Sequence, residues 1–193
     1  MDGGGADPVA ALRAALLTPD EARAMDAHGK TEAAVLLPMF GFPEAPGLIF
    51  TERRIDMRRH AGEISFPGGR RDGPGEDLMT TALRESEEEI GLDRAGVELV
   101  GALPPVGTFV TNYKVYPFVG LVPTNVSLAL SPAEVAKILH LRLDVLRGGF
   151  EMKRLFRRGM PIKTPTYTVE RHLIWGATAR ILGELLDRLT ELR

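Results

Sequence analysis

The sequence contains no cysteine among its 193 residues. Disulfide bonds, thiolate catalysis and cysteine-ligated zinc are therefore excluded, and no redox compartment is indicated. No apolar run approaches the roughly 20 residues that a membrane-spanning helix needs. An excess of one charge is also missing, because 24 basic side chains stand against 26 acidic ones, for a formal net charge of −2. This balance does not indicate a nucleic acid or an anionic membrane as partner.

Targeting signals are missing as well. The N-terminal stretch MDGGGADPVAALRAALLTP has no basic region ahead of its apolar residues, and the C-terminal TELR is not a peroxisomal address. We therefore expect a cytoplasmic protein. The length and the 44% hydrophobic content suit one domain with a sizeable core. We expect residues 1–7 to be disordered and residues 8–193 to form that single domain, as a monomer or a homodimer.

Apolar periodicity and capping signals predict mixed strands and helices. Expected helices are 8–17, a short one from the capping box at 18–21 to about 27, 77–91, a short turn of helix after Ser131-Pro132-Ala133-Glu134, and 177–192. Expected strands are 33–40, 47–51, 62–66, 97–103, 106–109, 115–122 and 138–143, with a strand pair or extended segment at 166–175. Residues 147–159 look basic and irregular. Without strict alternation, we expect a mixed sheet with helices on both faces.

The stretch around which the chain is organised is GEISFPGGRRDGPGEDLMTTALRESEEEIGL, residues 62–92. It predicts a short strand, a glycine-rich loop and a helix whose last turns carry four glutamates. Residues three or four apart share a helix face, so Glu85, Glu88 and Glu89 should converge. The helix macrodipole disfavours anions at this end, so a positive partner is needed. Clustered carboxylates suit Mg²⁺ or Mn²⁺, which usually bridge to phosphate oxygens.

An acidic run is commonly just a solvated helix end, but its context here argues otherwise. Gly68 and Gly69 are followed by residues at fixed offsets, namely Glu76, Arg84, Glu85, Glu88, Glu89, Gly91 and Leu92. This resembles the Nudix box, G-x5-E-x7-R-E-U-x-E-E-x-G-U, where U is apolar. Two departures are visible. Six residues separate Gly69 from Glu76 instead of five, in a turn-rich segment that can absorb an insertion, and Ser86 occupies a usually apolar position.

The resemblance implies an α/β fold, the Nudix-type α/β/α sandwich with a mixed sheet and helices on both faces. It implies that Glu85, Glu88 and Glu89 hold the divalent ions, with the Gly69 carbonyl as a further ligand. Glu88, or an acid from a later loop such as Glu134, would orient or deprotonate the attacking water. Glu134 also has a simpler interpretation, as a capping-box partner. We expect Arg84 to orient the glutamates and Glu76 to be structural.

The residues just upstream resemble a second signature, that of the coenzyme A pyrophosphatase branch, L-L-T-x-x-S-x3-R-x3-G-x3-F-P-G-G. Thr51, Arg58, Gly62 and residues 66–69 fall at matching spacings, while Arg54 stands where serine is usual. The segment 173–182 also resembles the C-terminal part of that branch. A basic cluster lies within this signature, and we expect it to bind substrate phosphate through Arg53, Arg58 and Arg59, with Arg54 and His60 beside them. A solvated basic face is the alternative.

The implied activity is divalent-metal-dependent hydrolysis of the diphosphate of coenzyme A and its derivatives, giving 4'-phosphopantetheine and adenosine 3',5'-bisphosphate. Alternatives are another Nudix substrate (ADP-ribose, a dinucleotide or a nucleoside triphosphate) and a binding module that does not hydrolyse its nucleotide. The intact glutamates argue against the last. A thioesterase is not indicated, because no serine sits in a recognisable nucleophile elbow. For His28, His140 and His172 we expect structural roles, since none has metal-ligand spacing.

Overall fold

A computed structural model describes residues 7–56, 62–108, 111–157 and 160–191. Residues 1–6, Arg58, Arg59, His60 and Phe109, about which the sequence makes predictions, lie outside the described residues. The elements are α1 (Pro8–Ala15), α2 (Pro19–Ala24), β1 (Thr31–Phe40), β2 (Gly47–Arg53), β3 (Ile64–Ser65), β4 (Gly68–Arg70), α3 (Leu78–Ile90), a 3-10 turn η1 (Arg94–Gly96), β5 (Glu98–Ala102), β6 (Val106–Gly107), β7 (Tyr113–Leu121), β8 (Val135–Arg142), α4 (Leu143–Gly148), β9 (Phe150–Arg157), β10 (Met160–Val169), β11 (His172–Ile174) and α5 (Gly176–Thr190).

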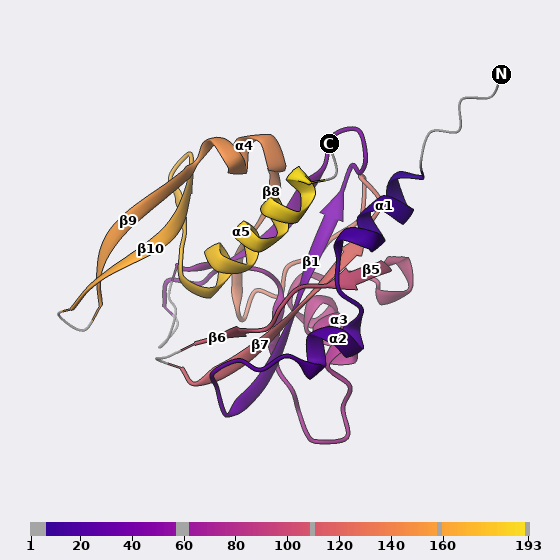
Figure 1. The fold of residues 1–193 in the computed structure, drawn as a ribbon, viewed down its shortest axis with the longest axis horizontal. Coiled ribbons are helices and arrows are strands. Elements are labelled where there is room, and N and C mark those ends of the chain that lie inside the picture. The colour runs from indigo at the N-terminus through magenta and orange to yellow at the C-terminus, as the bar shows by residue number, and fades with distance from the viewer. Residues whose placement is uncertain (1–6, 57–61, 109–110, 158–159, 192–193) are drawn as a thin grey trace.

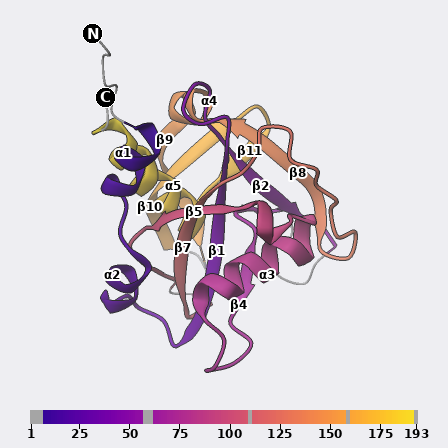
Figure 2. The same ribbon diagram turned by 90° about the vertical axis from the view of Figure 1, so that its right-hand side faces the viewer.

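The main sheet is mixed and lies between two layers of helices. Its path is β3-β2-β1-β7-β5, with β4 on β1, β6 on β7 and β8 on β2. Only β1 and β7 run parallel among the described pairs of this sheet. Figure 2 shows α3 on one side of the sheet and α1 and α5 on the other. The predicted α/β/α sandwich is therefore confirmed.

Two apolar cores follow from this layering. Alternate residues of a strand face opposite sides of the sheet, so neighbouring residues in β2 enter different cores. Phe50 packs in the core beneath α1 and α5, and Ile49 packs in the core beneath α2 and α3. The same alternation sends Glu52 and Arg53, at the end of β2, to opposite faces. No helix in the described part of the chain is long and apolar enough to cross a membrane.

Strand β1 changes partners along one of its edges. Met39 and Phe40 pair with β2, whereas Ala33, Ala34 and Val35 pair with β4. Between these two pairings, the Leu36 N–H donates to the Pro67 carbonyl. The two glycines after Pro67 therefore lie in a short strand, β4, and not in the loop that their sequence predicted. This strand lies beside α3.

One further sequence expectation is wrong. Residues 147–159 were expected to be irregular, but Phe150–Arg157 form strand β9, because each residue finds a partner in β10. The short turn expected after Ser131 is present: the Val135 N–H donates to the Ser131 carbonyl, and the chain then enters β8.

The other elements have the predicted type, with shifts at their ends, but helix α4 and residues 160–165 of β10 lie where no helix or strand was predicted. The β9–β10 hairpin is the exception to the compact layering. It extends away from the main sheet, at the left of Figure 1, and is joined to β11 in a separate three-stranded sheet.

Candidate active site

Helix α3 begins and ends at the predicted residues. The Asp77 carboxylate accepts hydrogen bonds from the backbone N–H groups of Met79 (3.0 Å) and Thr80 (3.3 Å), and so caps the helix start. Gly91 ends the helix in the left-handed conformation with φ of 64°, and its N–H donates to the Glu87 carbonyl at 2.9 Å. Both ends of the glutamate-bearing helix are therefore fixed by local chemistry.

One face of α3 is buried against the sheet. Leu78, Ala82 and Ile90 belong to the core beneath this helix. Ser86 lies on the same buried face, where its hydroxyl donates to the Ala82 carbonyl at 2.7 Å. This internal bond satisfies the hydroxyl and explains why serine is tolerated at a position that is usually apolar.

The glycines of β4 let the carboxylates of α3 lie against the backbone. A Cβ atom added to Gly69 would lie 2.3 Å from Cδ of Glu85, so any larger residue would displace that carboxylate. A Cβ added to Gly68, whose φ is 152°, would lie 2.3 Å from the Ala34 carbonyl oxygen. The Gly68 N–H donates to Oε2 of Glu89 at 3.2 Å. The two glycines therefore bring β4 into contact with two of the three glutamates that were predicted to bind metal.

Arg84 connects the acidic residues along α3. Its Nε lies 2.8 Å from Oε1 of Glu76, and its Nη1 lies 2.9 Å from Oε1 of Glu85 and 3.3 Å from Oε1 of Glu88. Hydrogen bonds from Arg84, and from the Asp72 N–H, lower the pKa of Glu76 to about 2. Arg84 thus contacts the glutamates that it was expected to orient, and Glu76, expected to be structural, also contacts Arg84, which the sequence did not predict.

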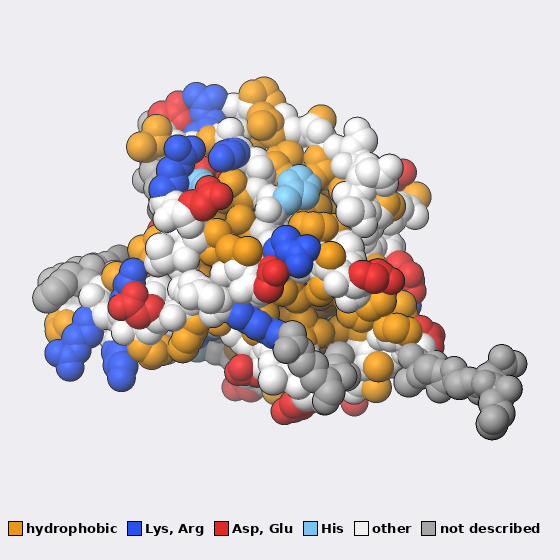
Figure 3. All heavy atoms as spheres, turned by 90° about the horizontal axis from the view of Figure 1, so that it is seen from above, with side chains coloured by type: hydrophobic (Ala, Val, Ile, Leu, Met, Phe, Trp, Pro, Cys, Tyr) orange, Lys and Arg blue, Asp and Glu red, His pale blue; other side chains and the backbone are white. Residues whose placement is uncertain are grey.

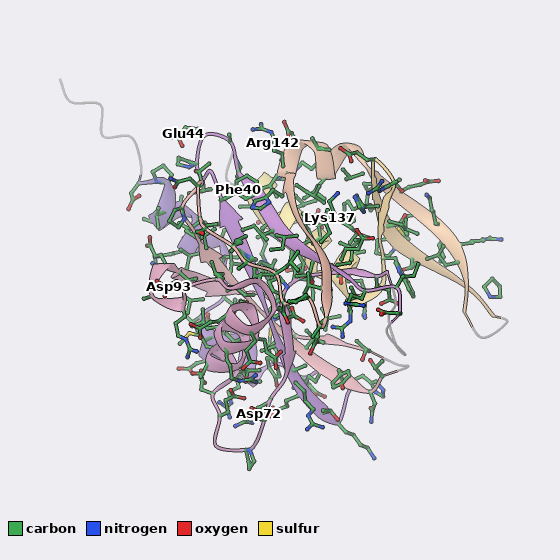
Figure 4. The ribbon with its side chains drawn as sticks, turned by 180° about the vertical axis from the view of Figure 1, so that it is seen from behind. Phe40, Glu44, Asp72, Asp93, Lys137 and Arg142 are labelled. Atoms are coloured by element: carbon green, nitrogen blue, oxygen red, sulfur yellow. The ribbon has the colours of Figure 1, made fainter. Side chains whose placement is uncertain are left out.

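The extra residue between Gly69 and Glu76 lies in a surface loop. Asp72 is near the tip of this loop, at the bottom of Figure 4. A Cβ added to Gly73 or Gly75 would meet nothing within 4 Å. Arg71 braces the loop by donating from Nε to the Glu76 carbonyl at 2.5 Å. The insertion is therefore accommodated away from the junction of β4 and α3, as the turn-rich sequence predicts.

Glu89 is the buried member of the glutamate set. It is 6% exposed, and burial raises the pKa of its carboxyl to about 7. The Gly68 N–H and the Arg53 guanidinium act in the opposite direction, while the charges of Glu85 and Glu134 raise the pKa further. Burial likewise raises the pKa of Glu85 above its usual range, against the effect of Arg84. Crowded, partly desolvated carboxylates of this kind are stabilised by an added cation.

Arg53 joins Glu89 to a residue from a distant part of the chain. Its Nη1 lies 3.7 Å from Oε1 of Glu89, and its Nη2 lies 3.6 Å from Oε2 of Glu134. Its Nε is buried and has no hydrogen-bond partner among the described protein atoms. Arg53 thus faces the glutamates with a side chain that is partly exposed.

The capping interpretation of Glu134 is wrong. The Ser131 N–H, which a capping partner would bind, donates instead to the Glu89 carbonyl at 2.8 Å. The turn containing Ser131 is thereby tied to the end of α3, and the Glu134 side chain lies beside Arg53. Glu134 is therefore the later-loop acid that reaches the site.

The carboxylate oxygens of this site are of the kind that a hard divalent cation prefers, but they do not converge on one point. Within the described residues, no three acidic or histidine side chains lie close enough together to hold a metal ion. Arg84 draws Glu85 and Glu88 along the helix, whereas Glu89 turns toward Gly68 and Arg53. The predicted convergence is thus divided between two arginines. The residues that could hold an ion stay the predicted ones, with Glu134 added.

A cavity of about 420 Å³ opens on the opposite face of the same end of β2. Its polar lining includes Glu52, Glu63 and His172, and its apolar lining includes Ile64, Leu173 and Trp175. The buried His172 has its Nδ1 3.7 Å from Oε2 of Glu52. Sequence reasoning treated His172 as merely structural, and only the resemblance of segment 173–182 indicated this region.

This cavity is connected to the glutamate site through the backbone of Arg53. The Gly62 N–H donates to the Arg53 carbonyl, and the Arg53 N–H donates to the Glu63 carbonyl. His140 is exposed, and its ring centroid lies 5.5 Å from that of Phe40. The two faces of one strand end therefore carry the acidic site and the cavity.

Comparison with known families identifies the family of this chain. The model of the NUDIX domain matches residues 30–157. The chain belongs to the Nudix family. Proteins described as uncharacterized Nudix hydrolase NudL, from Salmonella paratyphi B and Salmonella newport, are each 38% identical over 156 residues, which is 80% of this chain and 80% of theirs. The chain is thus an enzyme of the Nudix hydrolase class, whose members generally use divalent cations.

Solved structures share the fold at low sequence identity. The MutT protein of Methanosarcina mazei is 20% identical, with a TM-score of 0.56 over 83% of this chain and 95% of its own. The M. smegmatis Nudix hydrolase RenU is 17% identical, with a TM-score of 0.52 over 64% of this chain and 76% of its own. The NUDIX domain of Shewanella oneidensis NrtR, solved with ADP ribose, is 13% identical, with a TM-score of 0.51 over 88% and 90%. These likenesses show the Nudix fold.

Proposed function

We propose that this Nudix hydrolase cleaves the diphosphate bond of coenzyme A and its derivatives, giving 4'-phosphopantetheine and adenosine 3',5'-bisphosphate. We take residues 8–193 as its single domain and the cytoplasm as its location. The observation that carries the proposal is the arrangement beside Gly68 and Gly69, where Arg53 contacts Glu89 and Glu134 and Arg84 contacts Glu85 and Glu88. These glycines also end the upstream signature that begins at Thr51.

The acids would bind Mg²⁺ or Mn²⁺ through Glu85, Glu88, Glu89 and the Gly69 carbonyl. A bound ion of this kind neutralises charge on phosphoryl oxygens and makes water a better nucleophile. Other groups of the protein orient these carboxylates. Arg84 fixes Glu85 and Glu88 from one side, and the Gly68 N–H orients Glu89. The raised pKa of Glu89 means that cation binding displaces a proton from a buried carboxyl.

Two acids are candidates for accepting the proton of the attacking water. Glu88 is the more exposed end of the Arg84 network, with its carboxylate 3.3 Å from Nη1. Glu134 is half-exposed and lies across Arg53 from Glu89. Both carboxylates are more than half exposed, so either could accept the proton and later release it to solvent. We favour Glu88, as the Nudix resemblance implies.

The arginines would bind different phosphates. Arg53 faces the acids and is partly exposed, so its guanidinium would donate to the diphosphate at the point of cleavage. Arg58 and Arg59 would bind the 3'-phosphate on the ribose of coenzyme A, a role that rests on their place in the sequence signature. This assignment separates Arg53 from the two arginines with which the sequence grouped it.

The cavity behind β2 would receive an uncharged arm of the substrate. Its wall carries Glu52, Glu63 and Arg171, so it offers both hydrogen-bond acceptors and a donor to a polar, uncharged arm. The pantetheine arm offers two amide N–H groups and an apolar stem, which match these carboxylates and Leu173 and Trp175. ADP-ribose lacks such an arm. ADP-ribose, dinucleotides and nucleoside triphosphates are nevertheless the alternative substrates, and a non-hydrolysing nucleotide-binding module is a less favoured alternative.

A panel of diphosphates tests the proposal. Purified protein is incubated with Mg²⁺ or Mn²⁺ and with coenzyme A, ADP-ribose, a dinucleotide or a nucleoside triphosphate, and products are separated by chromatography. We expect the highest kcat/KM with coenzyme A and no turnover after chelation. Glu88→Gln and Glu89→Gln should each lower kcat by about a hundredfold or more, as loss of transition-state charge stabilisation does.

Glu87→Gln is the matched control, since Glu87 lies on the same helix but pairs with the exposed Arg94 (Nε to Oε2, 2.9 Å). It should retain full activity. Turnover that survives chelation would contradict the metal role. A preference for another diphosphate would instead identify one of the alternative substrates.

A further inference from the structure

The outer strand of the projecting hairpin has an open edge. The smaller sheet has the order β11-β10-β9, so among the described strands β9 pairs with β10 alone. In Figure 1 the hairpin stands clear of the main sheet, with this edge facing outward. An edge of eight residues is a template for another strand, and proteins usually shorten, charge or cover such edges.

The hydrogen-bond pattern shows which backbone groups are available. The Thr168 N–H donates to the Gly149 carbonyl at 2.8 Å, so this pair is hydrogen-bonded. In an antiparallel ladder, hydrogen-bonded and non-hydrogen-bonded pairs alternate. In the register of β9 and β10, Glu151 is opposite Thr166, and hence also bonded to β10. The N–H and C=O groups of Phe150, Met152 and Arg154 therefore point to the open edge.

Phe150 and Met152 share one face of this edge with Arg154, and Glu151 and Lys153 lie on the other face. Phe150 is 52% exposed and Met152 is 44% exposed, and they share a face because they are two residues apart. On the opposite face, Nζ of Lys153 lies 3.3 Å from Oε2 of Glu151. Figure 3 shows blue and orange side chains together on the lobe at the lower left, where the hairpin projects. The edge carries charges of both signs together with uncovered apolar area.

We propose that β9 pairs antiparallel with β9 of a second copy of this chain, with Met152 opposite the partner subunit's Met152. The two-fold axis then places Glu151 opposite the partner subunit's Lys153, and Lys153 opposite the partner subunit's Glu151. Phe150 lies opposite the partner subunit's Arg154. Three hydrogen-bonded pairs form, which supply about six backbone hydrogen bonds and join the two hairpin sheets into one.

Charge selects this register over its neighbours. A two-fold axis at Lys153 would set two lysines against each other, an axis at Glu151 would do the same with two glutamates, and an axis at Arg154 with two arginines. Like charges directly opposite destabilise a strand pair, and opposite charges stabilise it. Only the axis at Met152 places opposite charges face to face twice while it covers Met152 itself. The dimer is independent of the proposed substrate.

Charge reversal tests the pairing in solution. The full chain is examined by sedimentation equilibrium over a range of protein concentrations. Wild type should form dimers. Glu151→Lys and Lys153→Glu should each weaken dimerisation by about tenfold or more, because each places like charges at both symmetric positions. The double variant, with both changes, should restore it. Lys137→Glu, an exposed charge reversal on β8, is the control and should dimerise as wild type does.

A backbone variant tests the same edge differently. Met152→Pro removes an N–H that β10 does not use, so the hairpin keeps its own ladder while the open edge is blocked. Circular dichroism checks that the fold is retained. A monomer is expected for this variant. A wild type that is monomeric at every concentration would overturn the proposal, as would single reversals that dimerise like wild type. The double variant decides the matter if Met152→Pro proves unstable.

Discussion

The contact between Glu76 and Arg84 at the start of α3 predicts that the free energy of unfolding of the protein depends on pH. Glu76 accepts hydrogen bonds from Nε of Arg84 (2.8 Å), the Asp72 N–H (2.9 Å) and the Thr81 hydroxyl (2.9 Å). Substituting Glu76→Gln keeps the shape of the side chain and removes its charge. Arg84 then loses its anchor at the start of α3 and retains only Glu85 and Glu88 as charged partners on the helix.

The size of the effect follows from the pKa of Glu76, which falls from 4.5 to about 2. A difference of one pKa unit corresponds to about 1.4 kcal/mol, so the upper limit is about 3 kcal/mol. The Glu76 side chain is 16% exposed, and solvent screening reduces this to about 2 kcal/mol. Because the folded pKa is the lower one, this stability is present above the unfolded pKa and is lost as pH falls toward about 2.

Urea unfolding of wild type and Glu76→Gln, at several values between about pH 7 and pH 3, measures this difference. The variant should be about 2 kcal/mol less stable at neutral pH, and the gap should shrink on acidification. The control Glu87→Gln breaks an exposed pair and should cost less stability than Glu76→Gln does. A Glu76→Gln deficit that does not change with pH would refute the reasoning, since it would then reflect packing and not the charge.

Two more predictions concern the site directly. Gly69→Ala would place its Cβ 2.3 Å from Cδ of Glu85. It should therefore lower kcat by about tenfold or more while thermal unfolding shows a folded protein; unchanged kcat would mean that the Glu85 carboxylate does not need its present position. Arg58→Ala should raise KM for coenzyme A by roughly tenfold but leave KM for dephospho-coenzyme A nearly unchanged, since a charge-assisted bond is worth about 1.5–3 kcal/mol. Equal losses for both substrates would show that Arg58 does not bind the 3'-phosphate.

Helix α3 and its surroundings could be predicted because the sequence signals that define them are local. Asp77 and Gly91 define the two ends of α3 by capping chemistry that operates within a few residues. The pair of Arg84 with Glu88 could also be predicted, because residues four apart lie on the same face of a helix. Even the insertion before Glu76 could be placed on the surface from its turn residues.

The failures arise where contacts join distant segments. Nothing near Glu134 in the sequence indicates that Arg53, eighty-one residues earlier, lies beside it, so a local capping interpretation seemed sufficient. Strand β9 was missed because its basic composition is not typical of a strand, and the strand that it pairs with, β10, lies further along the chain. Helix geometry grouped Glu89 with Glu85 and Glu88, yet tertiary contacts with Gly68 and Arg53 turn its carboxylate away from Arg84.

The most direct test of the proposed reaction is the fate of the oxygen from water. Coenzyme A is hydrolysed in ¹⁸O-labelled water with Mg²⁺ or Mn²⁺, and the products are examined by mass spectrometry. We predict one ¹⁸O atom in a phosphate group of either 4'-phosphopantetheine or adenosine 3',5'-bisphosphate, because the attack is at phosphorus. With an acyl derivative, label in a released carboxylic acid and an intact diphosphate would contradict the account.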